Sequence, residues 1–274
     1  MRSARFCLLL ALIGFLAGCV SNPSTGRSQL ILFSATEVNA MGEQAKPEVT
    51  REFGGEVSSQ PLRVYVDDVG RRLVKHVEPD YRDLQWEFIV LDSDVINAFA
   101  LPGGKIFITR GLLSGFENEA QVAGVLGHEI GHVTARHVDE RLSQSLIAQG
   151  LVDLISQSTE TEVISLGAGL LAQGVMLKYS RNHESEADLQ GVKYMTAAGY
   201  NPGGMLEVLE VLEGASQGGR SPEFLSTHPY PETRIRDIRR LLKREYAYTQ
   251  DNPDYKKYPS RFQREAASYL APGR

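Results

Sequence analysis

Two histidines stand four residues apart, with a glutamate directly after the first, in His128-Glu129-Ile130-Gly131-His132. On a helix, at about 100° per residue, the two imidazoles point within about 40° of each other, so both can reach one metal ion. Zn²⁺ held by two histidines and a carboxylate keeps a position open for water, and Glu129 could take a proton from that water. The spacing therefore predicts a hydrolytic metal site that still needs a third ligand.

The residues before this stretch predict the helix that it requires. Asn118, followed three residues later by Gln121, is typical of a capping box at a helix start. An apolar stripe at helical spacing follows and consists of Val122, Val125, Leu126, Ile130 and Val133. Two histidines on an ordinary amphipathic helix are the alternative interpretation, and the helix and the spacing together favour the metal.

A second predicted helix offers candidates for the third ligand. Ser180 can cap its start, and on this helix Glu184 and Asp188 share one face. His183 and Glu186 point elsewhere. One carboxylate from the shared face would complete the site, and the spacing alone leaves open which one.

Histidines elsewhere fit the site less well. The long metzincin pattern needs Gly at position 135 and His at position 138, where this chain has Ala135 and Val138, so that class is excluded. Extending the helix places His137 nearly opposite His128, and we expect it to pack or to face solvent. His183 is expected to be an ordinary helix residue.

The hydrophobic period changes to two after Gln85. Strand-like runs cover residues 86–90, 95–101 and 105–109, and Pro102-Gly103-Gly104 joins the last two. We therefore predict a mainly helical α+β fold with a small antiparallel sheet beside the histidine helix, whose metal site makes it a candidate zinc-metallopeptidase domain. The run containing Asn97, Ala98 and Phe99 is expected at the rim of this sheet, where it would pair with an extended peptide substrate. The alternative is a strand that only supports the active helix.

Residues 146–177 are apolar but are interrupted by charges at Asp153, Glu160 and Glu162, so no run is long enough to span a bilayer. A helical hairpin beside the active site is the simpler expectation. A membrane-contacting or lid element is the alternative.

The first residues are typical of a secretory leader. A charged start and an apolar run precede Leu16-Ala17-Gly18-Cys19, which resembles a bacterial lipobox. The resemblance implies cleavage before Cys19 and a lipid on its thiol, and Val20 favours the outer membrane because it is not the aspartate of inner-membrane retention. An uncleaved anchor or a plain secretory signal is the alternative. The expected divisions are signal peptide 1–18, lipidated tether 19–33, metallopeptidase domain 34–250 and surface tail 251–274.

The net charge and the number of cysteines limit which partners and which cross-links the protein can have. Loss of residues 1–18 would lower the 29 basic residues to 27, against 34 acidic ones, which argues against nucleic acid as a partner. Membrane attachment would then depend on the lipid. Without Cys7 and with Cys19 acylated, the domain could form no disulfide, so its stability would come from the core and the metal.

Four motifs together resemble the zinc peptidase family of HtpX, the CAAX prenyl endopeptidase and the mitochondrial Oma peptidase, over about residues 29–242. They are the histidine motif, the turn at 102–104, Glu184-Ser185-Glu186-Ala187-Asp188 and Leu225-Ser226-Thr227-His228-Pro229. The resemblance implies Glu184 as third zinc ligand, and it implies that Asp188 orients a zinc-bound histidine. The resemblance is strongest to the soluble, periplasmic members related to BepA and the Oma type, and the transmembrane helices of HtpX and the helical repeats of BepA are not expected here.

Two later residues gain roles only from this resemblance. In related periplasmic members the histidine corresponding to His228 approaches the zinc as a fourth ligand and holds the enzyme inactive; a turn residue bonded to backbone is the alternative. Arg234 matches an arginine near the metal that could stabilise the oxyanion on the peptide carbonyl, and a surface residue is the alternative.

The predicted function is a zinc-dependent metalloendopeptidase, with one Zn²⁺ per chain, that hydrolyses proteins or peptides at the bacterial cell envelope in protein quality control. The competing hypothesis is a zinc-bound chaperone or assembly factor, associated with the outer-membrane protein assembly machinery, whose peptidase site is normally shut by His228. A purely structural zinc site is disfavoured because it would use four Cys or His ligands and would not need Glu129.

Overall fold

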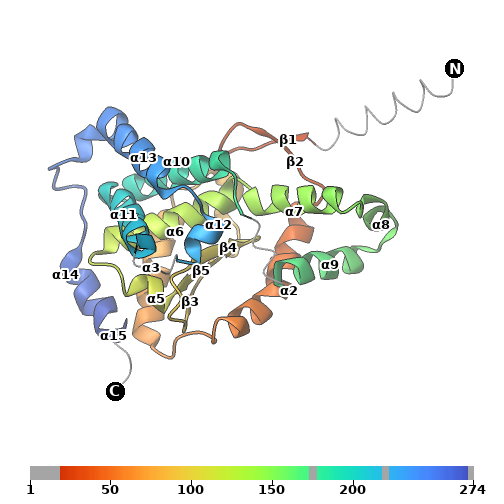
Figure 1. The fold of residues 1–274 in the computed structure, drawn as a ribbon, viewed down its shortest axis with the longest axis horizontal. Coiled ribbons are helices and arrows are strands. Elements are labelled where there is room, and N and C mark those ends of the chain that lie inside the picture. Colours follow the sequence, from red (N-terminus) through yellow and green to blue (C-terminus); the bar gives the residue numbers. More distant parts are fainter. Residues whose placement is uncertain (1–18, 173–177, 218–221, 271–274) are drawn as a thin grey trace.

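A three-stranded sheet lies between two groups of helices in the computed structural model (Figure 1). The structure describes residues 19–172, 178–217 and 222–270, so the predicted signal peptide lies outside the described residues. The strand order is β3 (Glu87–Leu91), β5 (Lys105–Thr109), β4 (Ala98–Leu101). The mainly helical α+β prediction is confirmed.

The prediction that this sheet is antiparallel was wrong. Strand β4 pairs antiparallel with β5, but β3 pairs with β5 in parallel, from Glu87 opposite Lys105 to Leu91 opposite Thr109. The tight turn between β4 and β5 produces the antiparallel pair, and it needs Gly103 and Gly104 because their φ angles are +78° and +82°. Strand β3 occupies the other side of β5, where direction is set by the chain crossing over, so alternation within each strand could not reveal it.

Both faces of the sheet are buried by helices. Alternate residues of β4 enter different cores: Ala98 and Ala100 face one, Phe99 and Leu101 the other. The first core is covered mainly by α3 (Gln60–Val74), α6 (Glu119–Thr134), α10 (Arg181–Ala197), α11 (Gly203–Gln217) and α13 (Pro231–Glu245). The second is covered by α2 (Ala35–Glu52), α7 (His137–Ala148) and α9 (Glu160–Ala172). Shorter helices lie between these elements: α4 (Pro79–Arg82), α5 (Arg110–Leu113), α8 (Val152–Gln157) and α12 (Phe224–Thr227).

The predicted helix starts are confirmed where a cap was visible in the sequence. At the start of α6, the Asn118 side chain accepts from the backbone N–H of Gln121, and the Gln121 side chain accepts from that of Asn118. Ser180 caps α10 by accepting from the backbone of His183. The caps satisfy backbone donors that a helix start leaves free, so these starts were predictable to the residue.

Helices α7, α8 and α9 form a helical hairpin that extends from the body of the molecule, at the right in Figure 1. The hairpin was expected over 146–177, of which 173–177 lie outside the described residues. Among the residues that the structure describes, no helix is long and apolar enough to cross a bilayer.

The segment predicted to be a tether is packed onto the domain instead. Strands β1 (Cys19–Ser21) and β2 (Ser28–Leu30) pair as an antiparallel hairpin, which we call the N-terminal hairpin. Its Asn22 and Gln29 are buried and donate to the backbone oxygens of Thr134 and Ala135 at 3.0 and 2.7 Å. These two amide side chains cap the C-terminal end of α6, which explains why the segment is held.

The predicted surface tail is also packed. It forms α14 (Pro259–Phe262), a π-helical turn at Gln263–Ala267 and α15 (Ser268–Leu270). Phe262 is 1% exposed and belongs to the main core. Arg261 contacts the buried Glu119 at the start of α6 at 2.8 Å and Asp68 at 2.6 Å. The sequence suggested a surface tail because the few apolar residues of this segment are spread among charged ones.

Candidate metal centre

Helix α6 presents two histidines to one point. His128 and His132 are 1% and 0% exposed, and their Nε2 atoms lie 3.0 Å apart. The four-residue spacing puts them one helical turn apart on the same face, as the sequence predicted. The cap at Asn118 and the amides of the N-terminal hairpin hold this helix at its two ends.

Helix α10 carries the carboxylate that faces these histidines. Glu184 Oε1 lies 3.5 Å from Nε2 of His132, and Oε2 lies 3.7 Å from Nε2 of His128. The helices approach closely because glycines line the contact: a Cβ added at Gly131 would lie 2.8 Å from the backbone oxygen of Ala187. Close backbone packing therefore brings the carboxylate within reach of the imidazoles.

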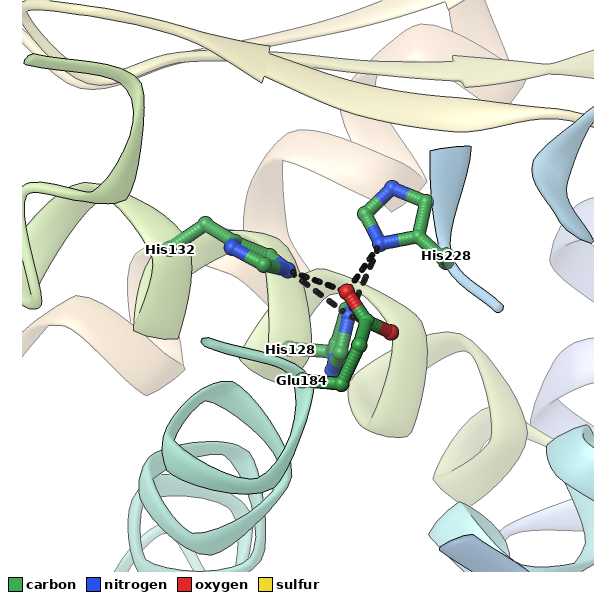
Figure 2. A group of neighbouring side chains, drawn as sticks. All are labelled: His128, His132, Glu184 and His228. Carbon is green, nitrogen blue, oxygen red and sulfur yellow. Dashed lines mark hydrogen bonds and ion pairs between the residues drawn. The ribbon is translucent and has the colours of Figure 1, made fainter. Parts of the chain in front are cut away.

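His228 approaches from the segment after α12 (Figure 2). Its backbone N–H donates to the oxygen of Phe224 at 2.8 Å, and the Phe224 ring stacks on the imidazole at 4.2 Å. Its Nδ1 lies 3.1 Å from Glu184 Oε1 and 3.3 Å from His128 Nε2. One ligand atom from each of His128, His132, Glu184 and His228 lies within 4.8 Å of the others, and all four residues are buried.

The chemistry of these four groups fits a cation. His128 and His132 each turn Nδ1 toward an outside acceptor, and so each turns a lone pair on Nε2 toward the centre. Burial lowers the pKa of His132 well below its usual value, so its ring is neutral. Lone pairs of these two imidazoles and a carboxylate then converge away from water, with the His228 ring beside them, an arrangement that a metal ion satisfies.

Glu129 lies beside the four groups without contacting them closely. It is 0% exposed, its Oε1 is 3.8 Å from Nε2 of His228, and neither carboxylate oxygen has a hydrogen bond from any described residue. Burial raises its pKa above the usual value. A buried carboxyl with a raised pKa is suited to taking up and releasing a proton.

Asp188 and Arg234 surround the ligands from outside. Asp188 Oδ1 lies 2.9 Å from Nδ1 of His128, the contact that the predicted orienting role requires. Burial alone would raise the pKa of Asp188, but Arg234 and the hydrogen bonds hold it below its usual value. Arg234 is buried, with Nη2 and Nη1 2.6 Å from Asp188 and Glu184 respectively. Its guanidinium is occupied by carboxylates, a placement that favours holding the ligands over the predicted oxyanion role.

Sequence reasoning missed two neighbours of His132. His137 was expected opposite His128, yet its Nδ1 lies 2.9 Å from Nδ1 of His132. The reason is that α6 ends before it and Arg136 adopts φ +53°, which turns His137 back toward the site. Tyr179 stacks on His132, with ring centroids 3.9 Å apart. A left-handed arginine gives no sequence signal, so the contact of His137 with His132 could not have been found from spacing.

An apolar cleft borders the centre along β4. It has a volume of about 570 Å³ including its open mouth, and its lining includes Phe99, Leu101, Val138, Leu142, Tyr179 and His228. Strand β4 is an edge of the sheet, as predicted for this stretch. Thr109 N–H donates to the oxygen of Asn97, so by antiparallel alternation the backbone groups of Ala98 and Ala100 point away from β5, toward the side where β4 pairs with no other described strand.

The sequence of this chain is similar to those of known proteins. The sequence matches peptidase family M48 over residues 62–242. It is 35% identical to mitochondrial metalloendopeptidase OMA1 of Schizosaccharomyces pombe over 205 residues, 74% of this chain and 60% of that protein. It is 36% identical to the beta-barrel assembly-enhancing protease of Escherichia coli over 190 residues, 65% of this chain and 38% of that protein. The chain thus spans less than two thirds of either relative.

The matched region begins in α3, ends in α13 and contains all four converging side chains together with Glu129. A match over this region, more than half of the sequence, shows that the chain belongs to peptidase family M48.

Proposed function

We propose that this protein is a zinc-dependent metalloendopeptidase. The observation that carries the proposal is the convergence of His128, His132 and Glu184 beside the buried carboxyl of Glu129. Two histidines, one carboxylate and an adjacent carboxyl form the donor set of a hydrolytic zinc site. The three groups would hold the metal, and His228 would reach its remaining position in the arrangement of this structure.

When bound there, Zn²⁺ would polarise the peptide carbonyl and lower the pKa of a water molecule to about 7. Glu129 would accept a proton as this water attacks the carbonyl carbon, and would then pass the proton to the leaving amine. Asp188 would keep the Nδ1 proton of His128, so that Nε2 stays available. Arg234 would balance the charge of Glu184 and Asp188.

An extended substrate would lie along β4. The outward backbone groups of Ala98 and Ala100 can pair with a peptide main chain, while Asn97 and Phe99 hold the strand to β5. The apolar cleft beside Phe99 would receive one substrate side chain. This arrangement selects a backbone in extended form and places few demands on sequence, as suits cleavage of unfolded proteins.

The decisive test compares Glu129→Gln with wild type. The substitution keeps the volume but removes the proton acceptor, so zinc content should stay equal while hydrolysis of an unfolded protein such as casein is lost. Glu184→Ala is the matched variant, and we expect it to lose zinc. Full proteolysis by Glu129→Gln, or unchanged zinc in Glu184→Ala, would show that the assignment is wrong.

We also propose that the site rests closed. His228 is 0% exposed and lies where a fourth ligand would displace the water, and it is wedged against Phe224. Movement of the α12 segment would free the position. His228→Ala should then raise basal proteolysis, whereas Phe224→Leu, which keeps an apolar contact, should do so less. Equal activity of His228→Ala and wild type would rule out the closed state.

This closed arrangement is what favours the second candidate, a zinc-bound assembly factor or chaperone for outer-membrane proteins. The name of the Escherichia coli relative supports a link to β-barrel assembly. For this candidate, binding of unfolded outer-membrane proteins should persist in Glu129→Gln. If Glu129→Gln loses the binding of unfolded proteins as well as proteolysis, the chaperone candidate is ruled out and the peptidase remains.

We propose a location at the bacterial cell envelope, with a lipid on Cys19 and the outer membrane favoured. The support is the sequence of residues 16–19. Mass spectrometry of the mature N-terminus tests it: a diacylglyceryl group on Cys19 is expected, and Cys19→Ser should release the protein from membranes. An unmodified Cys19 in membrane-bound protein would contradict the proposal.

A further inference from the structure

The two histidines of α6 are held by different partners on their outer sides. Nδ1 of His128 faces a carboxylate, that of Asp188, at 2.9 Å. Nδ1 of His132 faces another imidazole, that of His137, at 2.9 Å. The Nε2 atom of His137 in turn lies 3.0 Å from Oε2 of Glu186. A chain of contacts thus leads away from His132 toward the surface.

The hydrogen bonds of this chain have one consistent direction. If His132 binds a metal through Nε2, its Nδ1 carries the proton and donates to Nδ1 of His137. His137 must then carry its own proton on Nε2, and it donates that proton to the carboxylate of Glu186. Each link fixes the tautomer of the next, so the carboxylate at the end determines which atom of His132 points at the centre.

Glu186 is held by the N-terminal hairpin. Arg27, in the turn between β1 and β2, lies with Nε 3.0 Å from Glu186 and with Nη2 2.6 Å from Glu140 on α7. The guanidinium therefore joins α10 to α7, the two helices that carry Glu186 and His137. Without Arg27, two carboxylates near each other would lose their shared cation, and Glu186 would lose its fixed position.

We propose that His137 is a positioning residue for the metal centre and that the N-terminal hairpin controls it through Arg27 and Glu186. The inference rests on the proposed zinc site. It makes Arg27, which is more than 100 residues from His132 in sequence, part of the metal site. Outer hydrogen bonds of this kind commonly change metal affinity by about 10- to 100-fold when removed.

The first test measures zinc affinity of the full chain by competition with a chelator. His137→Phe keeps a ring against Tyr179 but removes the acceptor, and we expect zinc binding to weaken about 10- to 100-fold. In His137→Asn, the side-chain oxygen takes the place of Nδ1, so affinity should return most of the way to wild type. This recovery would not occur if the residue only filled space.

The control is His183→Phe. The His183 ring stacks on that of His137, with centroids 4.4 Å apart, and its Nε2 lies 3.4 Å from Glu140 Oε2. His183→Phe therefore changes a similar ring that does not contact a histidine ligand, and the affinity for zinc should stay equal to that of wild type. Equal losses in His137→Phe and His183→Phe would overturn the proposal in favour of general packing.

The second test examines the contribution of Arg27 in the N-terminal hairpin. Arg27 is 30% exposed, so Arg27→Ala should fold even if the buried variants do not. We expect weaker zinc binding and a changed visible absorption spectrum of the Co²⁺-loaded protein, because that spectrum reports ligand geometry. Arg71→Ala, which removes an exposed ion pair with Asp67, is the matched control.

These outcomes separate two failures. If wild type binds no zinc, the proposed function fails and takes this inference with it. If wild type binds zinc tightly, but Arg27→Ala and His137→Phe match it in affinity and in the Co²⁺ spectrum, the peptidase site stands and the control by the hairpin is refuted.

Discussion

Gly131 is the position where one added carbon should disturb the metal centre. A Cβ there would lie 2.8 Å from the backbone oxygen of Ala187 and 3.0 Å from its Cα, whereas ordinary contact begins at 3.4 Å. Both atoms are backbone, so no side chain can rotate away. In Gly131→Ala, helix α10 must therefore move from α6 by roughly half an ångström.

The magnitude follows from what α10 carries. Glu184 lies one turn before Ala187 on the same helix, so its carboxylate moves with the backbone. Metal–ligand distances keep to about 0.2 Å of their ideal values, less than this displacement. We expect zinc affinity to fall at least about tenfold, equivalent to about 1.4 kcal/mol. The metal-free protein should lose about 1–3 kcal/mol in free energy of unfolding, because the interface is overpacked.

Chelator competition measures the affinity, and urea unfolding in EDTA measures the stability. Gly169→Ala is the matched control: it adds the same carbon in helix α9, where nothing lies within 4 Å. It should leave zinc binding unchanged and stabilise the helix by up to about 1 kcal/mol. If Gly131→Ala keeps both wild-type affinity and wild-type stability, the close packing of α6 and α10 does not position Glu184.

Three further predictions concern charge and metal. Arg234→Met leaves the buried carboxylates of Glu184 and Asp188 without their cation, and urea unfolding of the metal-free protein should show a loss of about 3–5 kcal/mol; a loss below about 1 kcal/mol would contradict this. Chelation should lower the thermal unfolding midpoint, and added zinc should raise it with concentration; a midpoint indifferent to zinc would argue against the site. Burial alone would raise the pKa of Glu186, but its hydrogen bond and Arg27 hold it below 4.5. Its ion pair with Arg27 therefore stabilises the fold above about pH 4.5 and weakens below, so part of the stability difference between wild type and Arg27→Ala, in EDTA, should be lost as the pH falls. The part that comes from Glu140 should remain, because the pKa of that carboxyl lies further below its usual value; a constant difference would count against the role of Glu186.

The sequence predicted the elements that local chemistry specifies. Capping residues marked the starts of α6 and α10, and four-residue spacing put His128 and His132 on one face. The same reasoning placed Glu184 and Asp188 on one face of α10, and both contact Arg234 in the structure. Such features depend on neighbours within about one helical turn, and for that reason they can be read without a fold.

Features that depend on distant partners could not be predicted in this way. The parallel pairing of β3 with β5 depends on a crossover that strand periodicity does not encode. The position of His137 depends on the left-handed conformation of Arg136, where glycine would have been the visible signal. The N-terminal hairpin was mistaken for a tether because Asn22 and Gln29 are polar, although both are buried as caps.

Helix α6, which carries the two histidines, is held at its C-terminal end by the N-terminal hairpin and at its N-terminal end by the C-terminal segment. Asn22 reaches across 112 residues of sequence to the last turn of α6, and Arg261 reaches across 142 residues to Glu119 in its first turn. The backbone N–H of Ala120 also donates to the oxygen of Lys257, which follows every metal ligand in the chain.

The order of synthesis gives this arrangement a consequence. A ribosome makes the histidines, Glu184 and His228 before it makes Arg261, and loop closure over such distances must be compensated by contacts that exist only afterwards. We therefore expect the nascent chain to contain every ligand while the first turn of α6 still lacks its partner. The helix that carries the two histidines would then be fully held only after Arg261 and Lys257 have been synthesised, which is later than every proposed ligand.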